Sequence, residues 1–70
     1  MVYFTEIRKA QHYVDYHEHE VPWSKVVEII LTTKNKRKKG DKIEIETGKY
    51  YVLCELKETI LWVINAKHQR

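Results

Sequence analysis

The sequence predicts an α+β domain in which two N-terminal helices pack on one face of a three- to four-stranded antiparallel sheet. Three observations lead to this expectation. Apolar residues recur at spacings of three and four in the N-terminal half, and they alternate with polar residues in the C-terminal half. A run of cations separates the two halves. At 70 residues, the chain is expected to form one small domain over residues 1–70.

The first helix is expected before Pro22. Thr5 can cap its start, and Glu6 in the first turn suits the positive end of the helix dipole. Pro22 ends the helix, because the residue before a proline avoids helical geometry. The apolar face of this helix consists of Ile7, Ala10, Val14, His17 and Val21. Ahead of it, the apolar residues 2–4 leave open a short strand at the edge of the sheet.

A second helix is expected to begin at Pro22 and to continue to the threonines at 32 and 33. Proline is common at the first helical position because no amide donor is needed there. The apolar stripe of this helix is Trp23, Val26, Val27, Ile30 and Leu31. The cationic run and Gly40–Asp41 are then expected to form a loop that leads into the sheet.

The C-terminal half is expected to form a meander of three strands. Residues 42–46 alternate between polar and apolar, and Thr47–Gly48 suits a two-residue turn. This turn would pair Ile45 with Tyr50 and would place the apolar residues of both strands on one face. Residues 60–64 are apolar at every position, which is typical of a strand covered on both faces.

The last strand also predicts a partner-binding surface. If the turn before it has two residues, Trp62 and Ile64 share a face with Tyr51 and Leu53, whereas a three-residue turn would separate the two pairs. Two short helices cover only one face of a sheet, so the other face would present an apolar, aromatic patch. Tyr51 and Trp62 could stack on RNA bases there. Packing within the core is the alternative.

The positive charge is concentrated in one segment. Five cations, Lys34, Lys36, Arg37, Lys38 and Lys39, stand within six positions. The whole chain has 13 Lys and Arg against 10 Asp and Glu, so the remainder without these five is mildly acidic. Clustered cations bind phosphates without base specificity, and RNA is the expected partner. A solvated loop without a ligand is the alternative.

Composition excludes several other classes. The single cysteine, Cys54, excludes an internal disulfide and fits a reducing cytoplasm, and its apolar neighbours predict a buried, unreactive thiol. No apolar stretch approaches the roughly 20 residues that span a bilayer, and no signal-peptide pattern is present. A cytoplasmic protein without membrane contact is therefore expected. With only two glycines, a phosphate-binding loop is not predicted, and no cofactor is expected.

His12, Lys67 and Arg70 are the candidate catalytic residues. Histidine can act as a general acid or base near neutral pH, and cations can stabilise the charge that develops on phosphorus during RNA cleavage. A surface histidine and a frayed polar C-terminus are the alternatives. His17 would point to the apolar side of the first helix. Because no two histidines are four residues apart, no metal site is expected.

The order of two helices, a basic loop and three strands resembles the small RelE and BrnT toxin domains and their relatives with an early histidine. The segments that carry the resemblance are residues 12–22, 26–31, 49–53 and 61–66. It implies a compact sheet with two helices on one side, cleavage of mRNA on or off the ribosome, and inhibition by an antitoxin protein. His12, Lys67 and Arg70 stand in roughly corresponding positions, whereas no aromatic acid–base residue follows the last strand.

Two functions therefore follow as hypotheses. One is an RNA-directed, toxin-like domain of a toxin–antitoxin system that acts as a metal-independent endoribonuclease. The other is a non-catalytic module that binds nucleic acid or protein and forms a homodimer through the open sheet face. The position of the basic run distinguishes the two hypotheses. A catalytic site requires the run to lie within about 10 Å of His12 and the C-terminal tail, which is the screening length of ordinary salt.

Overall fold

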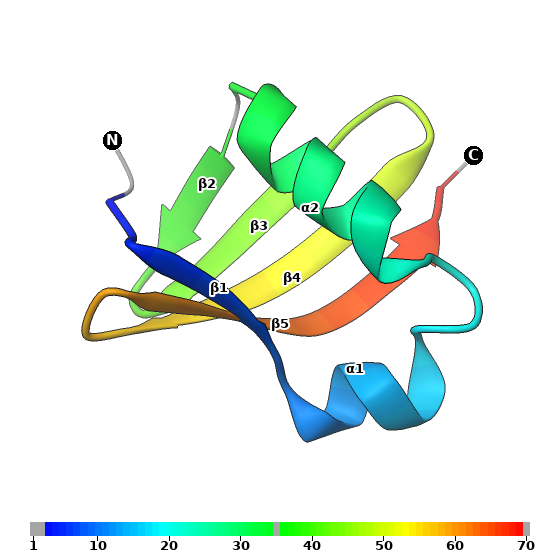
Figure 1. The fold of residues 1–70 in the computed structure, drawn as a ribbon. Coiled ribbons are helices and arrows are strands. Elements are labelled where there is room, and N and C mark those ends of the chain that lie inside the picture. Colours follow the sequence, from blue (N-terminus) through cyan, green and yellow to red (C-terminus); the bar gives the residue numbers. More distant parts are fainter. Residues whose placement is uncertain (1–2, 35, 70) are drawn as a thin grey trace.

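The computed structural model describes residues 3–34 and 36–69, which form one five-stranded sheet and two helices. The elements in chain order are β1 (Glu6–Lys9), α1 (Gln11–Tyr16), α2 (Trp23–Thr32), β2 (Lys36–Lys39), β3 (Lys42–Glu46), β4 (Tyr50–Lys57) and β5 (Ile60–His68). The strand order is β1-β5-β4-β3-β2 (Figure 1). The α+β class is confirmed, but the expected sheet of three or four antiparallel strands is wrong, because β1 runs parallel to β5 and β2 is a fifth strand.

Strand β1 lies where the sequence predicted the start of the first helix. It pairs with β5 from Glu6↔Ile60 to Lys9↔Val63. Thr5 does not cap a helix; its backbone N–H donates to the carbonyl of Thr59 at 2.8 Å, which holds the start of β1 against the turn before β5. The proposed strand over residues 2–4 includes a position outside the described residues, and the other two positions are not part of a strand. Pairing with β5 thus outweighs the local helical pattern.

Helix α1 is much shorter than predicted. It ends at Tyr16, and the backbone N–H groups of His17 and Glu18 both donate to the carbonyl of Tyr13 at 2.9 Å, which closes the last turn. Tyr13 is fully buried, and its hydroxyl donates to the carbonyl of Val21 at 2.6 Å. The helix lies at the edge of β5, beyond the end of β1 (Figure 1). The predicted continuous apolar face through His17 does not form.

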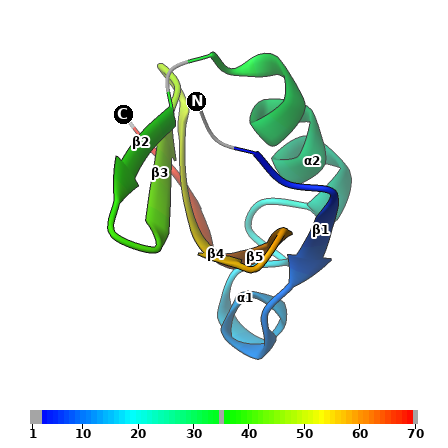
Figure 2. The same ribbon diagram turned by 90° about the vertical axis from the view of Figure 1, so that its left-hand side faces the viewer.

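Helix α2 confirms the second predicted helix and covers one face of the sheet (Figures 1 and 2). Pro22 precedes its first turn as the N-cap. Its buried residues are Val26, Ile29 and Ile30, whereas Leu31, which belongs to the predicted stripe, is 65% exposed. The hydrophobic core between α2 and the sheet includes Ile43, Ile45, Val52, Cys54, Leu61, Val63 and Ala66.

The cationic run forms strand β2 rather than a loop. It pairs with β3 from Lys36↔Ile45 to Lys39↔Lys42, and Gly40 and Asp41 make the two-residue turn between them. Gly40 has φ +64°, a conformation that glycine adopts without steric cost and that suits tight hairpins. Lysines are common on edge strands, where their charge opposes pairing with another sheet. Because side chains alternate along a strand, successive cations of β2 lie on opposite faces of the sheet.

The β3–β4 hairpin has the predicted faces but a different register. Ile45 pairs with Val52 rather than with Tyr50, because the connection is longer than the expected two residues. The Thr47 hydroxyl accepts the backbone N–H of Tyr50 at 2.9 Å and stabilises this longer turn. A shift of two residues preserves which side chains share a face. The inward position of Val52 is therefore unchanged.

The β4–β5 hairpin has the two-residue form of its turn, Glu58–Thr59. Leu61 and Val63 accordingly face the core. A β-bulge follows, because Cys54 pairs with Val63 whereas Leu53 pairs with Asn65, so that Ile64 has no opposite residue. The regular alternation along β5 is therefore interrupted at Ile64, and the predicted grouping of Ile64 with Trp62 no longer follows from it.

Candidate nucleic-acid interface

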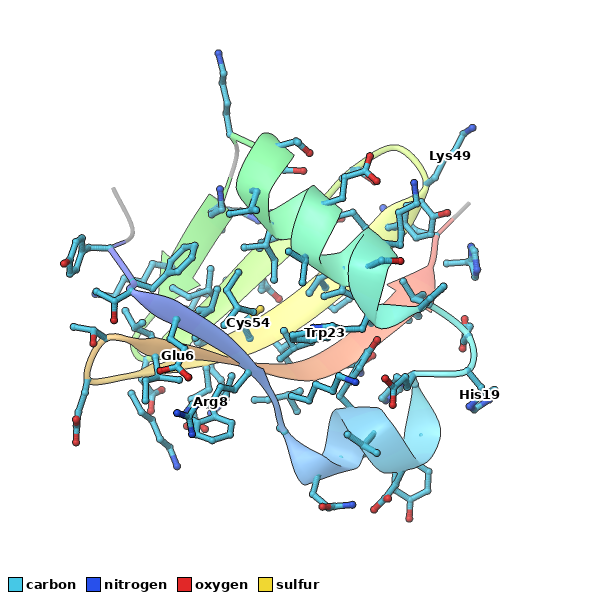
Figure 3. The ribbon with its side chains drawn as sticks, in the orientation of Figure 1. Glu6, Arg8, His19, Trp23, Lys49 and Cys54 are labelled. Atoms are coloured by element: carbon cyan, nitrogen blue, oxygen red, sulfur yellow. The ribbon has the colours of Figure 1, made fainter. Side chains whose placement is uncertain are left out.

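The face of the sheet opposite α2 carries no helix over β2, β3 and β4 in the described part of the chain (Figure 2). We call this the uncovered face. Its side chains alternate along each strand with those of the core, so that the register defines its members. On these three strands its members include Arg37, Lys39, Glu44, Tyr51 and Leu53, and the same face continues onto Trp62 and Lys67 of β5 and Arg8 of β1. Arg8 extends below β1 on the side away from α2 (Figure 3).

Strand pairing brings the two predicted binding sets together on the uncovered face. One row across the sheet runs from Arg37 through Glu44 to Leu53. The next row runs from Lys39 through β3 and β4 to Trp62 and ends at Arg8. Two cations of the basic run thus share a surface with residues predicted to bind a partner. Ile64 does not join this surface in the regular alternation, because of the bulge.

Each aromatic ring of the uncovered face has a cation against it. The Arg8 guanidinium carbon lies 5.8 Å from the centre of the Trp62 ring, and Lys67 Nζ lies 5.4 Å from the centre of the Tyr51 ring. Both rings are half-buried. Such pairs are attractive because the face of an aromatic ring is electronegative. The arrangement places a positive charge over each of the two rings.

A polar network holds Tyr51 in place. Its hydroxyl donates to Glu44 Oε2 at 2.9 Å. Burial, followed by this hydrogen bond, raises the pKa of Tyr51, so the phenol stays protonated at neutral pH. The same hydrogen bond, followed by that from Lys39, lowers the pKa of Glu44, which therefore stays ionised. The ring is thus fixed by its hydroxyl end.

The cations of β2 do not form one continuous patch. Arg37 pairs with Glu46 and lies 3.8 Å from Glu44, and Lys39 lies 3.3 Å from Glu44. Both cationic side chains nevertheless remain accessible, at 60% and 70% exposure.

The other cations of the run point elsewhere. Lys36 donates to the carbonyl of Thr33 at 2.5 Å, at the end of α2. Lys34 and Lys38 are exposed, and Lys38 projects to the α2 side of β2. Arg37 and Lys39 are therefore the cations of the run that face the aromatic residues.

The candidate catalytic residues lie on different elements. His12 lies on α1 at the β5 edge, whereas Lys67 lies on β5 and contacts Tyr51. Arg70 lies outside the described residues. Strand β2 lies at the other edge of the sheet, about 14 Å from β5 at the usual strand spacing. The basic strand and His12 therefore do not converge on one site.

The histidines occupy none of the positions of the uncovered face. His12, His17 and His19 precede α2 and lie outside the strands, and His19 extends from the turn after α1 (Figure 3). His68 is on β5 but alternates with Lys67, and its ring nitrogen Nε2 lies 3.2 Å from the carbonyl oxygen of Glu20. The chemistry offered by the uncovered face is consequently stacking and charge pairing.

Cys54 lies in the layer between the sheet and α2 (Figure 3), where no solvent reaches it. Burial raises the pKa of its thiol from 9.0 to about 12. The prediction of a buried thiol is confirmed.

The thiol also predicts a pH dependence of stability. In the unfolded chain Cys54 ionises above about pH 9, whereas the folded chain keeps the proton until about pH 12. The free energy of unfolding should therefore fall above pH 9, by up to about 1.4 kcal/mol per pH unit. Cys54→Val, which has a similar volume, should show a shallower fall between pH 8 and 10 in urea titrations. Parallel pH profiles for the two proteins would contradict this assignment.

Comparison with known proteins provides no relative: no family model matches the sequence, and the searches of curated proteins and of solved structures found no match. In the described residues, neither helix is long and apolar enough to cross a membrane.

Proposed function

We propose that this chain binds single-stranded RNA on the uncovered face of its sheet. The observation that carries the proposal is the placement of Tyr51 and Trp62 on neighbouring strands, each beside a cation, on the same face as Arg37 and Lys39. Open sheets that bind single-stranded nucleic acid combine aromatic stacking platforms with positive charge in this way. An RNA ligand agrees with the cytoplasmic location expected from the single free thiol.

The chemistry of the face favours an unpaired strand over a duplex. Stacking requires bases whose flat surfaces are exposed, which a duplex does not offer. Arg37 and Lys39 would contact phosphates at the β2 edge, while Arg8 and Lys67 would do so near the rings. The ion pairs with Glu44 and Glu46 lower the net charge of the face, so binding should be moderate in strength and sensitive to salt.

Binding rather than cleavage is the activity that this geometry supports. Acid–base cleavage of RNA needs a proton acceptor beside the 2′-hydroxyl group. Tyr51, the titratable aromatic residue of the face, has a raised pKa and stays protonated at neutral pH. Glu44 is ionised, but its pKa is lowered by hydrogen bonds from Tyr51 and Lys39, so it is a weak proton acceptor. His12, the histidine of the toxin-like hypothesis, lies on α1. An endoribonuclease would cleave the oligouridine, and a homodimer through the uncovered face would appear in sedimentation, so both alternatives are distinguished from RNA binding.

The proposal is tested by fluorescence anisotropy with a labelled oligouridine between 25 and 200 mM salt. Each phosphate contact should contribute about −0.7 to the slope of log K against log salt. Arg37→Gln combined with Lys39→Gln should make the slope less negative by about 1.4. The intact chain should bind a duplex of the same length more weakly, and the RNA should remain uncleaved in EDTA.

The matched control removes two cations from the other side of the sheet. Lys25 lies on α2, and Lys9 projects over Trp23, away from the uncovered face. Lys9→Gln combined with Lys25→Gln changes the net charge equally and should leave the slope close to that of the intact chain. Equal slopes for the two double variants, or no RNA binding at low salt, would overturn the proposal. Sedimentation at several protein concentrations would then identify a homodimer.

A further inference from the structure

Two histidines meet at the end of α1, although the sequence separates them by five positions. His12 Nε2 lies 3.2 Å from His17 Nε2, and the ring centres are 5.0 Å apart. In a continuous helix, residues five apart would point about 140° away from each other. They meet here because α1 ends at Tyr16 and His17 adopts a non-helical conformation, with φ −127° and ψ −21°.

The separation of the two nitrogens is that of neighbouring ligands on one metal ion. Imidazole nitrogens lie 2.0–2.1 Å from zinc, so two of them at a tetrahedral angle are about 3.3 Å apart, and at a right angle about 2.9 Å. A hydrogen bond between two Nε2 atoms already requires one of them to present a free lone pair. His12 is exposed, so its ring can turn to direct its lone pair toward an ion beside His17 Nε2.

The surroundings of His17 leave Nε2 as the ring nitrogen that faces His12. Nδ1 is buried and has no hydrogen-bond partner in the described part of the chain. Nε2 is the nitrogen that lies next to His12 Nε2. His12 is held on the other side, with its ring centre 4.9 Å from that of Tyr16.

We propose that His12 and His17 together bind one late first-row divalent cation through their Nε2 atoms. Imidazole suits copper, nickel and zinc, and copper(II) should bind most tightly of the three because affinities at such sites follow the Irving–Williams order. The inference is independent of RNA binding, because neither histidine belongs to the uncovered face.

Water completes the coordination of this ion. The described residues contain no group of three or more histidine, cysteine or carboxylate side chains that could hold a metal. The neighbouring carboxylates have other partners: Glu18 pairs with Lys9 at 2.5 Å, and Asp15 accepts from Gln11 at 2.9 Å. Two protein ligands leave open positions on the ion, so the site should be weaker than a closed structural zinc site and accessible to small ligands.

The site is tested by titration of the intact chain with copper(II), followed by visible absorption and electron paramagnetic resonance. The expected result is one ion per chain with two coordinated imidazole nitrogens. His12→Gln should weaken binding by more than about tenfold, since the loss of even an outer-shell partner of a metal ligand costs about 10- to 100-fold. His12 is exposed, so this variant should keep the fold, which circular dichroism will check. His17→Gln should weaken binding similarly.

His19→Gln and His68→Gln are the matched controls, because each removes one histidine from outside the pair. Both should bind copper(II) like the intact chain. Zinc provides a second readout, since it should shift the Nε2 resonances of His12 and His17 in nitrogen-15 spectra. Undiminished copper binding in His12→Gln, or a larger loss in either control, would overturn the proposal.

Discussion

Replacing Leu61 with alanine is expected to lower the free energy of unfolding by about 2–5 kcal/mol, the range for truncating a buried leucine. Leu61 is fully buried on β5, the strand that pairs with both β1 and β4. Its neighbours in the register are Ile7 on one side and Leu56 on the other. A domain of this size rarely has more than about 3–5 kcal/mol in total, so much of the variant should be unfolded at 25 °C.

Leu31→Ala is the matched control for this substitution. Leu31 is 65% exposed on α2, so the same loss of side-chain atoms should change the free energy of unfolding by about 0.5 kcal/mol or less. Urea titrations followed by circular dichroism measure both variants. Similar losses in the two variants would contradict the described packing of β5.

Replacing Trp62 with alanine is expected to weaken binding of oligouridine by about 5- to 150-fold. The estimate follows from about 1–3 kcal/mol per stacked base in alanine substitutions. Trp62 also positions Arg8, whose guanidinium lies over its ring, so part of the loss would come from a less ordered cation. Anisotropy titrations at constant low salt measure the effect.

Trp23→Phe is the control for a general loss of aromatic surface. Trp23 begins α2 and contacts Tyr13, with ring centres 5.6 Å apart, on the opposite side of the sheet (Figure 3). This variant should bind RNA like the intact chain. Circular dichroism establishes that both variants remain folded. Unchanged affinity in folded Trp62→Ala would exclude this ring as a stacking platform.

The elements that could be predicted have strong periodicity over enough residues. Helix α2 was predicted because apolar side chains recur on one stripe after a proline. The faces of β3 and β4 were predicted because alternation has a period of two, so an error of two residues in the register leaves each side chain on its face. Ile45 and Val52 therefore face the core although their predicted partners were wrong.

The elements that could not be predicted are short and depend on distant partners. Residues 6–9 fit either a helix or a strand, and the choice is made by the free edge of β5, more than fifty residues later. Residues 36–39 are all cationic, so they show no alternation of apolar and polar residues. They form a strand because their backbone pairs with that of β3. The bulge at Ile64 has no signal of its own in the sequence.

Part of the candidate site could likewise be predicted from the sequence, and part depends on strand pairing. The alternation placed Tyr51 and Leu53 on one face and left open whether Trp62 joins them, which the two-residue turn at Glu58–Thr59 decided. The charge count identified the basic run. Only the strand order placed Arg37 and Lys39 on that surface, because pairing across β3 and β4 joins segments that are distant in the chain. Side-chain periodicity is a local property, whereas pairing depends on hydrogen bonds between remote strands.

The cationic run and the histidines show this difference most clearly. The amino-acid sequence determined that positive charge is concentrated between residues 34 and 39 and that three histidines lie before α2. The tertiary structure decided that alternate cations of the run face opposite sides of the sheet. It also decided that His12 and His17 meet, because α1 stops at Tyr16 and His17 leaves the helical conformation. The end of a helix depends on tertiary contacts as well as on local propensity, so the spacing of the two histidines in the chain does not determine their distance.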